Sequence, residues 1–498
     1  METVQNLLYG FSVALSPMNL LFCFLGCLIG TLVGVLPGLG PAAAISLLLP
    51  MTFRLDITGA IIMLAGIYYG AMYGGSTTSI LVNIPGESSS VMTCIDGYQM
   101  AKQGRAGPAL GIAAFGSLIA GTLSVIGLMI FAPFLSEAAL KFGPPEYFGL
   151  IIMSLSLVTY LVRGSMVKGL SMASLGLLLS TVGGDPMSSR LRFDFDITLL
   201  RGGLGIIPMV MGLFGISEVL SSVVWREEQS FVKTKILGLL PSLRDWKDSL
   251  LPIFRGTFIG FFLGILPGVG LSMPTYISYG LERKLSKHPE RFGKGAIEGV
   301  AGPEASNNAA AGGIFVPMLS LGIPPTPTMA LFLGALLIHR IQPGPLLIQE
   351  QPGIFWGLIS SMYIGNIMLL ILNLPLIALW VQVLRVPYGY LFPMILVFCL
   401  TGAYSLNNSA GEAAIMVLFG IFGFLLRYFN YEAPPFVLAF ILGPILEESF
   451  RQSLTLSKGK FLIFFNRPIA ALFLLITVLI VGSGLMRLKS VEKLKGGS

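Results

Sequence analysis

The chain has 498 residues, of which 54% are hydrophobic and only 11% are charged. Soluble proteins carry roughly 25% charged residues, so this chain lacks the polar surface that a water-soluble globule would need. Its net charge of +7 does not indicate a nucleic-acid partner, because the basic residues lie in short loops between apolar runs. The composition therefore predicts an all-α polytopic membrane protein in the lipid bilayer.

Apolar runs that are long enough to cross a membrane recur along the chain. They cover residues 18–36, 57–74, 107–135, 146–162, 165–183, 200–224, 251–273, 353–384, 388–404, 411–427 and 468–486. Further apolar stretches are interrupted by polar residues, Gly or Pro, at 41–53, 75–86, 298–323, 326–340 and 433–446. We expect about 12 transmembrane helices, together with broken or re-entrant helices.

The pattern divides the chain into four predicted parts. These are a first transmembrane half (1–224), a polar connecting loop (225–250), a second transmembrane half (251–446), and a C-terminal loop with the last transmembrane helix and a basic tail (447–498). Basic clusters at 283–294 and 487–495 are predicted to be cytoplasmic by the positive-inside rule. The first residues lack the basic region of a cleavable signal peptide.

Two internal repeats point to duplicated halves. Residues 30–40 read GTLVGVLPGLG and residues 260–270 read GFFLGILPGVG. Later in each half, a Gly pair (74–75 and 312–313) precedes an Ile-Pro segment, NIPGESS at 83–89 and GIPPTPT at 322–328. Chance similarity in a Gly-rich chain is the alternative reading. The ordered matches favour two repeat-related halves, which we expect to be inverted relative to each other.

Duplicated halves with Gly- and Pro-interrupted apolar segments are typical of secondary transporters, in which the broken helices meet at the substrate site. A break leaves backbone N–H groups unpaired at the start of the next helix, where the helix dipole adds partial positive charge. Such a helix start can bind a carboxylate without a fixed cation. The sequence therefore predicts a site for small carboxylates at the breaks.

Small polar residues surround the breaks, and their amide and hydroxyl groups could donate to carboxylate oxygens or offer oxygens to Na⁺. The predicted substrate-binding residues are Gly38, Gly40, Ser76, Thr77, Asn83, Gly86, Ser88, Asn307, Asn308, Thr326 and Thr328. Helix capping or interhelical hydrogen bonding is the simpler explanation for any single Ser or Thr. The adjacent Asn307 and Asn308 favour a functional role, because two buried amides need several partners.

Glu304 lies within an otherwise uncharged run, and an acid at membrane depth is a candidate cation or proton site. We predict that Glu304, Asn307 and Asn83 take part in ion coupling, with Na⁺ or H⁺ as the coupling ion and possible Na⁺ sites at the two helix breaks. Arg255 and Arg340 are the main candidates for a buried positive charge, and Arg255 is expected to reach toward the membrane interface.

Motifs for other chemistry are weak. Gly38, Gly40 and Ala43 fit a dinucleotide-binding pattern, but they end an apolar span instead of following a soluble strand. The segment that begins at Gly86 lacks the Gly-Lys-Ser/Thr of a phosphate-binding loop. With two histidines and no paired cysteine motif, the sequence predicts no enzyme activity and no organic cofactor.

The blocks YYGAMYGGSTTSILVNIPGESSSVMTCIDGYQMAKQGRAGPAL (68–110) and FGKGAIEGVAGPEASNNAAAGG (292–313), with the two LPGxG breaks, resemble the large membrane subunit of tripartite tricarboxylate transporters. This resemblance implies secondary active uptake across the bacterial inner membrane, driven by Na⁺ or protons. It implies two partners, a small membrane subunit and a periplasmic solute-binding protein that delivers the substrate.

The resemblance implies a carboxylate substrate, either a tricarboxylate or a related di- or aromatic carboxylate. Members of the family usually carry Gly-Ser where Pro325 and Thr326 stand, more small residues after the second LPG, and often Gly at the position of Arg340. Because of these departures, the expected substrate is a carboxylate in general and not citrate in particular. An ion or solute channel is the alternative function.

Overall fold

The computed structural model describes residues 2–36, 40–52, 55–162, 165–224, 238–383 and 388–495. Most of these residues are helical, and one two-stranded antiparallel sheet pairs Gly183 with Arg192 and Gly184 with Leu191. The prediction of an all-α fold is therefore confirmed. Gly38, which the sequence predicts in the site, lies outside the described residues.

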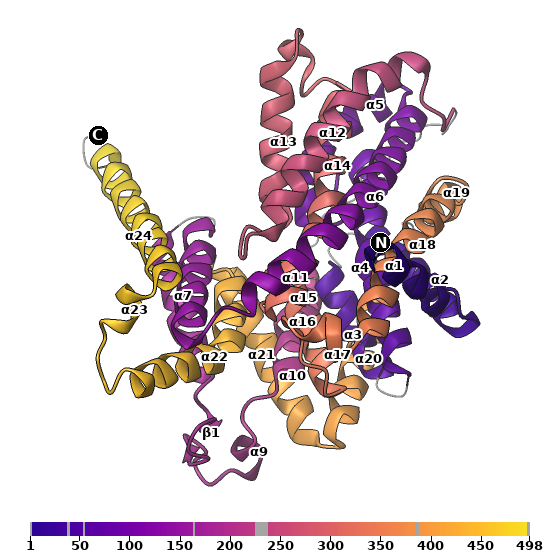
Figure 1. The fold of residues 1–498 in the computed structure, drawn as a ribbon. Coiled ribbons are helices and arrows are strands. Elements are labelled where there is room, and N and C mark those ends of the chain that lie inside the picture. The colour runs from indigo at the N-terminus through magenta and orange to yellow at the C-terminus, as the bar shows by residue number, and fades with distance from the viewer. Residues whose placement is uncertain are drawn as a thin grey trace.

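The elements up to the connecting segment are mostly long helices (Figure 1). They are α1 Glu2–Ala14, α2 Pro17–Val35, α3 Pro41–Thr52, α4 Ile57–Val82, η1 Ser88–Ser90, α5 Val91–Lys102, α6 Ala106–Ala139, α7 Pro144–Leu161, α8 Met166–Leu179, β1 Gly183–Gly184, β2 Leu191–Arg192, α9 Thr198–Arg201, α10 Ile206–Val210, η2 (a π-helical segment) Met211–Ile216 and α11 Ser217–Val224.

The described elements after the connecting segment are all helical. They are α12 Leu243–Ile265, α13 Ser272–Leu285, η3 Pro289–Arg291, α14 Glu298–Gly313, α15 Phe315–Leu321, α16 Pro327–Ile338, α17 Leu347–Glu350, α18 Pro352–Asn373, α19 Ile377–Val383, α20 Tyr388–Asn407, α21 Ala410–Tyr428, α22 Pro434–Leu456, α23 Ile463–Asn466 and α24 Pro468–Lys495.

Seven described helical segments are long and apolar enough to cross a membrane. They are α2, α4, α6, the continuous segment Ile206–Val224, α12, α18 and α21. Four shorter apolar helices lie at Met166–Leu179, Pro327–Ile338, Pro393–Asn407 and Pro468–Gly484. A multi-pass membrane fold is thus supported by length and composition, whereas the number of about 12 crossings stays a prediction.

Several helix boundaries differ from the sequence prediction. Residues 243–250, predicted as part of the connecting loop, form the first turns of α12. Ser242 caps this helix by accepting the N–H of Asp245, whose carboxylate in turn accepts the N–H of Ser242. Helix α22 likewise continues to Leu456. Helix α4 runs unbroken through the Gly pair at 74–75 to Val82, so the break follows residue 82.

Glycines on α2 bring its backbone into close contact with α4. A Cβ atom built on Gly26, Gly30 or Gly34 would lie 2.3–2.4 Å from a carbonyl oxygen of α4, those of Met63, Ile67 and Ala71 respectively. Both helices therefore advance together in four-residue steps, which means that they run parallel. Small residues that allow such close approach are a common source of helix association in membranes.

The same spacing packs α12 against α14. A Cβ atom on Gly256, Gly260 or Gly264 would lie 2.1–2.7 Å from a carbonyl oxygen of α14, contributed by Gly302, Ser306 and Ala310. This pair is also parallel. Each pair ends alike, because the extended residues Leu36 and Leu266 follow the last turns of α2 and α12.

The two central helices α4 and α14 pack antiparallel. Ser76 of α4 bonds Glu304 of α14, whereas the rings of Tyr68 and Tyr69 lie 6.0 Å from that of Phe315, which follows α14. Residue numbers thus fall along one helix as they rise along the other. Both helices are buried along nearly their whole length. The α2/α4 pair is therefore inverted relative to the α12/α14 pair.

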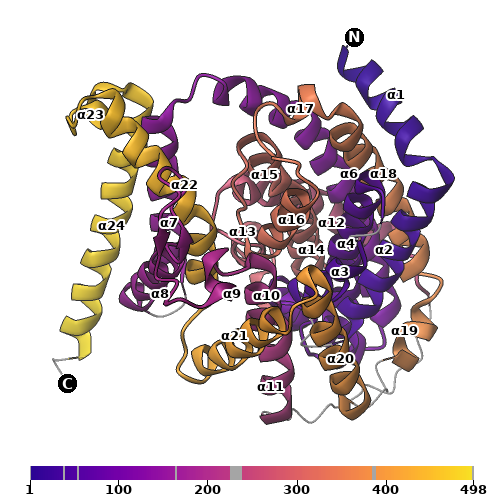
Figure 2. The same ribbon diagram turned by 90° about the horizontal axis from the view of Figure 1, so that it is seen from below.

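Helices of each half enclose the core of the other. Helix α6 packs on α14 and α18 packs on α4, while α8 contacts α22 and α21 contacts η2. Helix α24 packs on α7 at one edge of the molecule, and α1 and α2 lie at the opposite edge (Figure 1 and Figure 2).

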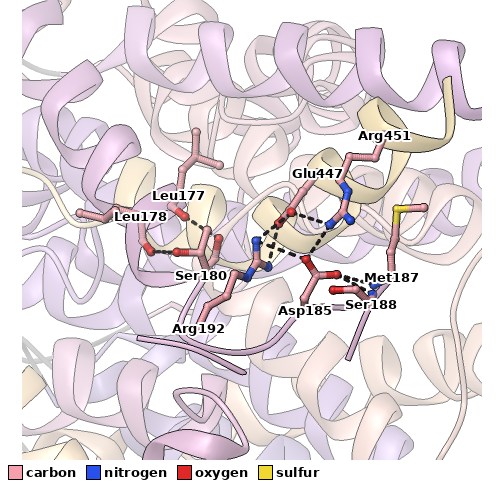
Figure 3. Close-up of polar contacts among 10 residues, drawn as sticks. Leu177, Leu178, Ser180, Asp185, Met187, Ser188, Arg192, Glu447 and Arg451 are labelled. Atoms are coloured by element: carbon pink, nitrogen blue, oxygen red, sulfur yellow. Dashed lines mark hydrogen bonds and ion pairs between the residues drawn. The ribbon is translucent and has the colours of Figure 1, made fainter. Parts of the chain in front are cut away.

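A network of charges attaches the connector between α8 and α9 to the end of α22 (Figure 3). Arg192 binds Glu447 through two hydrogen bonds of 2.9 and 3.0 Å, and Arg451 contacts Asp185 at 2.7 Å and Glu447 at 3.0 Å. Asp185 also accepts the backbone N–H groups of Met187 and Ser188 at 2.8 Å. Hydrogen bonds from Ser188 and Met187 together with the Arg451 cation hold the pKa of Asp185 well below its ordinary value.

The packing predicts that Gly260→Ala destabilises the protein, because the new methyl group would lie 2.1 Å from the Ser306 carbonyl oxygen. Overpacking of this kind costs about 1–3 kcal/mol. We expect a lower thermal unfolding midpoint in detergent than for Gly280→Ala, whose Cβ has open space. Equal midpoints for the two variants would contradict the close α12–α14 contact.

The charge network predicts a pH-dependent effect of Asp185→Asn. Since the folded-state pKa of Asp185 is lowered, its stabilisation is present above the ordinary aspartate pKa of about 4 and declines as the pH falls below it. We expect faster amide hydrogen exchange at Met187 and Ser188 at pH 7, with a smaller difference from wild type at pH 3. Asp196→Asn, at a side chain that is 98% exposed, serves as the control. A difference that does not depend on pH would count against this assignment.

Candidate functional site

Four interruptions of the helical chain converge on one cavity of about 650 Å³. Its lining includes residues 40–42, 85–88, 268–273 and 325–328. The first and third of these segments follow α2 and α12, and the second and fourth follow α4 and α15. The structure thus brings together the described parts of the breaks that the sequence repeat marks.

A helix begins at or just after each segment. Pro41 opens α3 and Pro327 opens α16, at first-turn positions that lack an intrahelical hydrogen-bond partner in any case. Helix α13 begins at Ser272, and η1 leads into α5 after Glu87. Four helix starts, each with backbone donors and a partial positive charge, therefore border the cavity.

The break after α12 depends on glycine. Gly268 and Gly270 have φ angles of +83° and +66°, a conformation that a side chain disfavours. The Gly268 N–H donates to the Pro325 carbonyl at 3.0 Å and thereby joins the two breaks of the second half. Ser272 donates to Ser88 at 2.9 Å and joins the second half to the first.

Other lining residues come from α7, η2, α11, α21 and α22 and are largely apolar. Among them, Glu218 of α11 and Arg427 of α21 form an ion pair, with Oε2 and Nη2 2.5 Å apart. Sequence reasoning missed these two residues. The signal that could have found them is a charge inside an apolar run, since Glu218 lies within 200–224 and Arg427 within 411–427.

Five of the predicted substrate-binding residues line the cavity. They are Gly40, Gly86, Ser88, Thr326 and Thr328. The side chain of Thr326 caps α16 by accepting the Met329 N–H at 3.3 Å, so it has the capping role that the sequence offered as an alternative. Thr77 and Ser76 lie instead on the buried face of α4, where they line a separate small cavity of about 10 Å³.

Asn83 ends α4 in the left-handed conformation, with φ +61°, and is exposed. Gly322 ends α15 in the same conformation, with φ +70°. Asparagine and glycine are the residues that most readily adopt this geometry. Asn83 does not belong to the described lining of the cavity, and its position has a backbone explanation. Its predicted contacts with substrate and cation stay predictions.

Glu304 is fully buried between the halves. Ser76 of α4 donates to one carboxylate oxygen at 2.6 Å, and Thr93 of α5 donates to the other. Two hydroxyl donors at membrane depth satisfy a carboxylate only in part, because it offers about four acceptor sites. The arrangement leaves acceptor capacity that a proton or a small cation could use.

Asn307 and Asn308 point to different partners. The Asn307 amide donates to Glu87 at 3.0 Å, and Glu87 itself lines the cavity. The Asn308 amide donates to Ser117 of α6 at 2.7 Å. The Oδ1 atoms of both residues are buried without a hydrogen-bond partner among the described residues. Unpaired buried oxygens are costly for the fold, so these two atoms are candidate positions for a ligand.

The described residues contain no group of three or more His, Cys, Asp or Glu side chains that could hold a metal ion. Any Na⁺ would therefore depend on mixed oxygen ligands, for which Glu304, Asn307 and Asn308 are the candidates.

Two further charged residues, Arg255 and Asp96, have structural partners, whereas Arg340 is exposed. Arg255 pairs with Glu282 of α13, with Nε and Oε1 2.8 Å apart, and its expected reach toward the membrane interface stays a prediction. Arg340 is exposed, with φ +60°. Asp96 is buried and accepts three backbone N–H groups, from Gly293, Gly295 and Ala296, which ties α5 to the start of α14.

Comparisons with known proteins give two relatives from Agrobacterium vitis. An uncharacterized 52.8 kDa protein in the TAR-I ttuC' 3' region is 48% identical over 471 residues, which cover 95% of this chain and 94% of the relative. An uncharacterized protein in the TAR-II ttuC' 3' region is 50% identical over 212 residues, 43% of this chain and 88% of the relative. No solved structure matches.

A family model matches residues 20–438, which include all four breaks and both central helices. Its description is the tripartite tricarboxylate transporter TctA family. Members of this family are components of a transport system with other subunits. The chain therefore belongs to the tripartite tricarboxylate transporter TctA family, as the sequence resemblance predicts.

Proposed function

We propose that this chain is the translocating subunit of a secondary carrier that takes up small carboxylates. The convergence of four helix starts on one cavity of about 650 Å³ carries the proposal. Helix starts bind carboxylates through backbone N–H groups and the helix dipole. Pockets of roughly 300–1,000 Å³ suit small organic ligands, so the volume accommodates a di- or tricarboxylate.

Two inverted repeats would form this site. Parallel, glycine-packed pairs occur in both halves, as α2 with α4 and α12 with α14, and the pairs have opposite directions. The backbone ends of α4 and α15 match as well, at Asn83 and Gly322. Inverted repeats of this kind support alternating access around a site near the bilayer midplane.

Glu304 is the proposed coupling residue, with the orphan oxygens of Asn307 and Asn308 as further ligands. It joins α14 to α4 and α5, and Asn307 links the same helix to Glu87 at the cavity. Binding of Na⁺ or H⁺ at Glu304 would therefore affect the substrate cavity, because one turn of α14 connects Glu304 with Asn307, which contacts Glu87.

The proposed location is the bacterial inner membrane, with a small membrane subunit and a periplasmic solute-binding protein as partners. The connector at 286–297 and the α5–α6 turn lie together, since Gln103 donates to the Lys294 carbonyl at 2.7 Å. The basic residues there favour the cytoplasmic side. Saturable uptake of radiolabelled citrate or succinate into proteoliposomes under an inward Na⁺ or proton gradient tests the function. Downhill, non-saturable ion flux would favour a channel.

Asn307→Ala is predicted to lower carboxylate uptake at least about tenfold, since a lost hydrogen bond to a charged group costs about 1.5–3 kcal/mol. The change removes the amide donor to Glu87, and initial uptake rates in proteoliposomes measure its effect. Asn466→Ala, at an exposed amide on α23, should transport normally. If the Asn307→Ala variant takes up carboxylate at the wild-type rate, Asn307 does not contribute to the site.

Glu304→Gln is predicted to abolish gradient-driven net uptake while substrate exchange persists, because a neutral amide neither releases a proton nor attracts a cation. Its carbonyl oxygen can still accept from Ser76 or Thr93, so the fold should survive. The measurement compares net uptake under an inward Na⁺ or proton gradient with counterflow in its absence. Glu290→Gln, at an exposed side chain of η3, is the control. Unaltered gradient dependence would refute the coupling role.

A further inference from the structure

Two groups of elements line the large cavity, and they differ in chemistry. The breaks contribute backbone groups, small polar side chains and Glu87. The second group, from α7, η2, α11, α21 and α22, is mainly apolar and includes Leu161, Phe214 and Leu438. This second group also contains the charged pair Glu218–Arg427. The pair has no role in the anion binding that we propose at the helix starts.

Arg427 is the only basic residue in the described lining of the cavity. Its side chain is 37% exposed, and the pair with Glu218 engages Nη2. A guanidinium has five N–H donors in a planar fork and can bind two carboxylates at once. The arrangement therefore leaves donors that an anion in the cavity could reach.

The pair lies on two helical segments that are long and apolar enough to span a membrane, with Arg427 in the last turn of α21. Glu218 lies two residues after the end of the π-helical segment η2, and such segments often occur at functional sites. Charges inside a membrane are costly and commonly mark substrate or ion pathways. The alternative to a functional role is that the ion pair only links α11 to α21.

We propose that Arg427 binds a second carboxylate of the transported anion, while the helix starts at the breaks bind the first. This assignment rests on the proposed carboxylate transport. It specifies the substrate as an anion with at least two carboxylates, joined by a spacer that contacts the apolar part of the lining. Arg427 is thus a specificity-determining residue.

Glu218 has a complementary role. In the empty cavity it neutralises Arg427, so that no uncompensated charge stays in the membrane. When the anion arrives, the guanidinium is shared between Glu218 and the substrate carboxylate. Binding therefore does not require that a bare cation be maintained within the bilayer in the empty carrier.

The test uses the full-length protein in detergent and measures binding of succinate, glutarate and citrate by calorimetry, each beside an analogue in which one carboxylate is an amide. Wild type should prefer the parent anion. Arg427→Gln should lower its affinity about tenfold or more, the scale of one charge-assisted hydrogen bond, with little change for the amide. Arg427→Lys should restore part of the preference.

Glu218→Gln should keep or increase the preference for the parent anion, because the competing carboxylate is gone. Arg467→Gln removes an arginine that pairs with Glu146 away from the cavity lining, and it should behave as wild type. The ratio of affinities for anion and amide is the decisive readout, since a purely structural tie would not alter it.

Equal losses for anion and amide in Arg427→Gln, or an unchanged ratio, would overturn the role of Arg427 while leaving carboxylate binding intact. If wild type binds monocarboxylates as well as the parent anions, the two-carboxylate requirement fails in the same way. If wild type binds none of the probes, carboxylate transport itself fails and this inference with it.

Discussion

The fold depends on one constraint of the bilayer, namely that backbone N–H and C=O groups have no water to bind there. A break in a membrane helix is tolerated where protein or a polar cavity satisfies the freed groups. Here the breaks of both halves border one cavity, and the Gly268 N–H of one break donates to the Pro325 carbonyl of another. The backbone groups that are freed at the breaks must be satisfied, and the same groups can bind an anion in the cavity.

Close glycine packing holds these breaks in place. The last turns of α2 and α12 lie against α4 and α14 at distances that exclude a Cβ atom, so each break starts from a rigid position. The antiparallel contact of α4 with α14 then brings Ser76 to Glu304. Because lipid provides little hydrophobic force between helices, contact of this kind and interhelical hydrogen bonds supply the cohesion.

Charged groups in the molecule follow two patterns. Asp96 accepts three backbone N–H groups, and the Asp185–Arg192–Glu447–Arg451 network consists of paired charges; both tie connectors to helices. Glu304 and the Asn pair retain unused acceptor atoms, and the Glu218–Arg427 pair lines the cavity. Incomplete satisfaction of buried polar groups is costly, which makes these positions the candidates for ligands that come and go.

The sequence by itself determined the membrane class, the family and the location of the breaks, because hydropathy, Gly-Pro spacing and long local blocks are encoded along the chain. It also predicted Gly40, Gly86, Ser88, Thr326 and Thr328, all of which line the cavity. Only the tertiary structure decided that Asn83 has a backbone explanation, that Arg255 pairs with Glu282, and that Arg427 lines the cavity. The reason is physical: partners such as Glu218 and Arg427 lie far apart in sequence, and no local pattern specifies which helix faces meet.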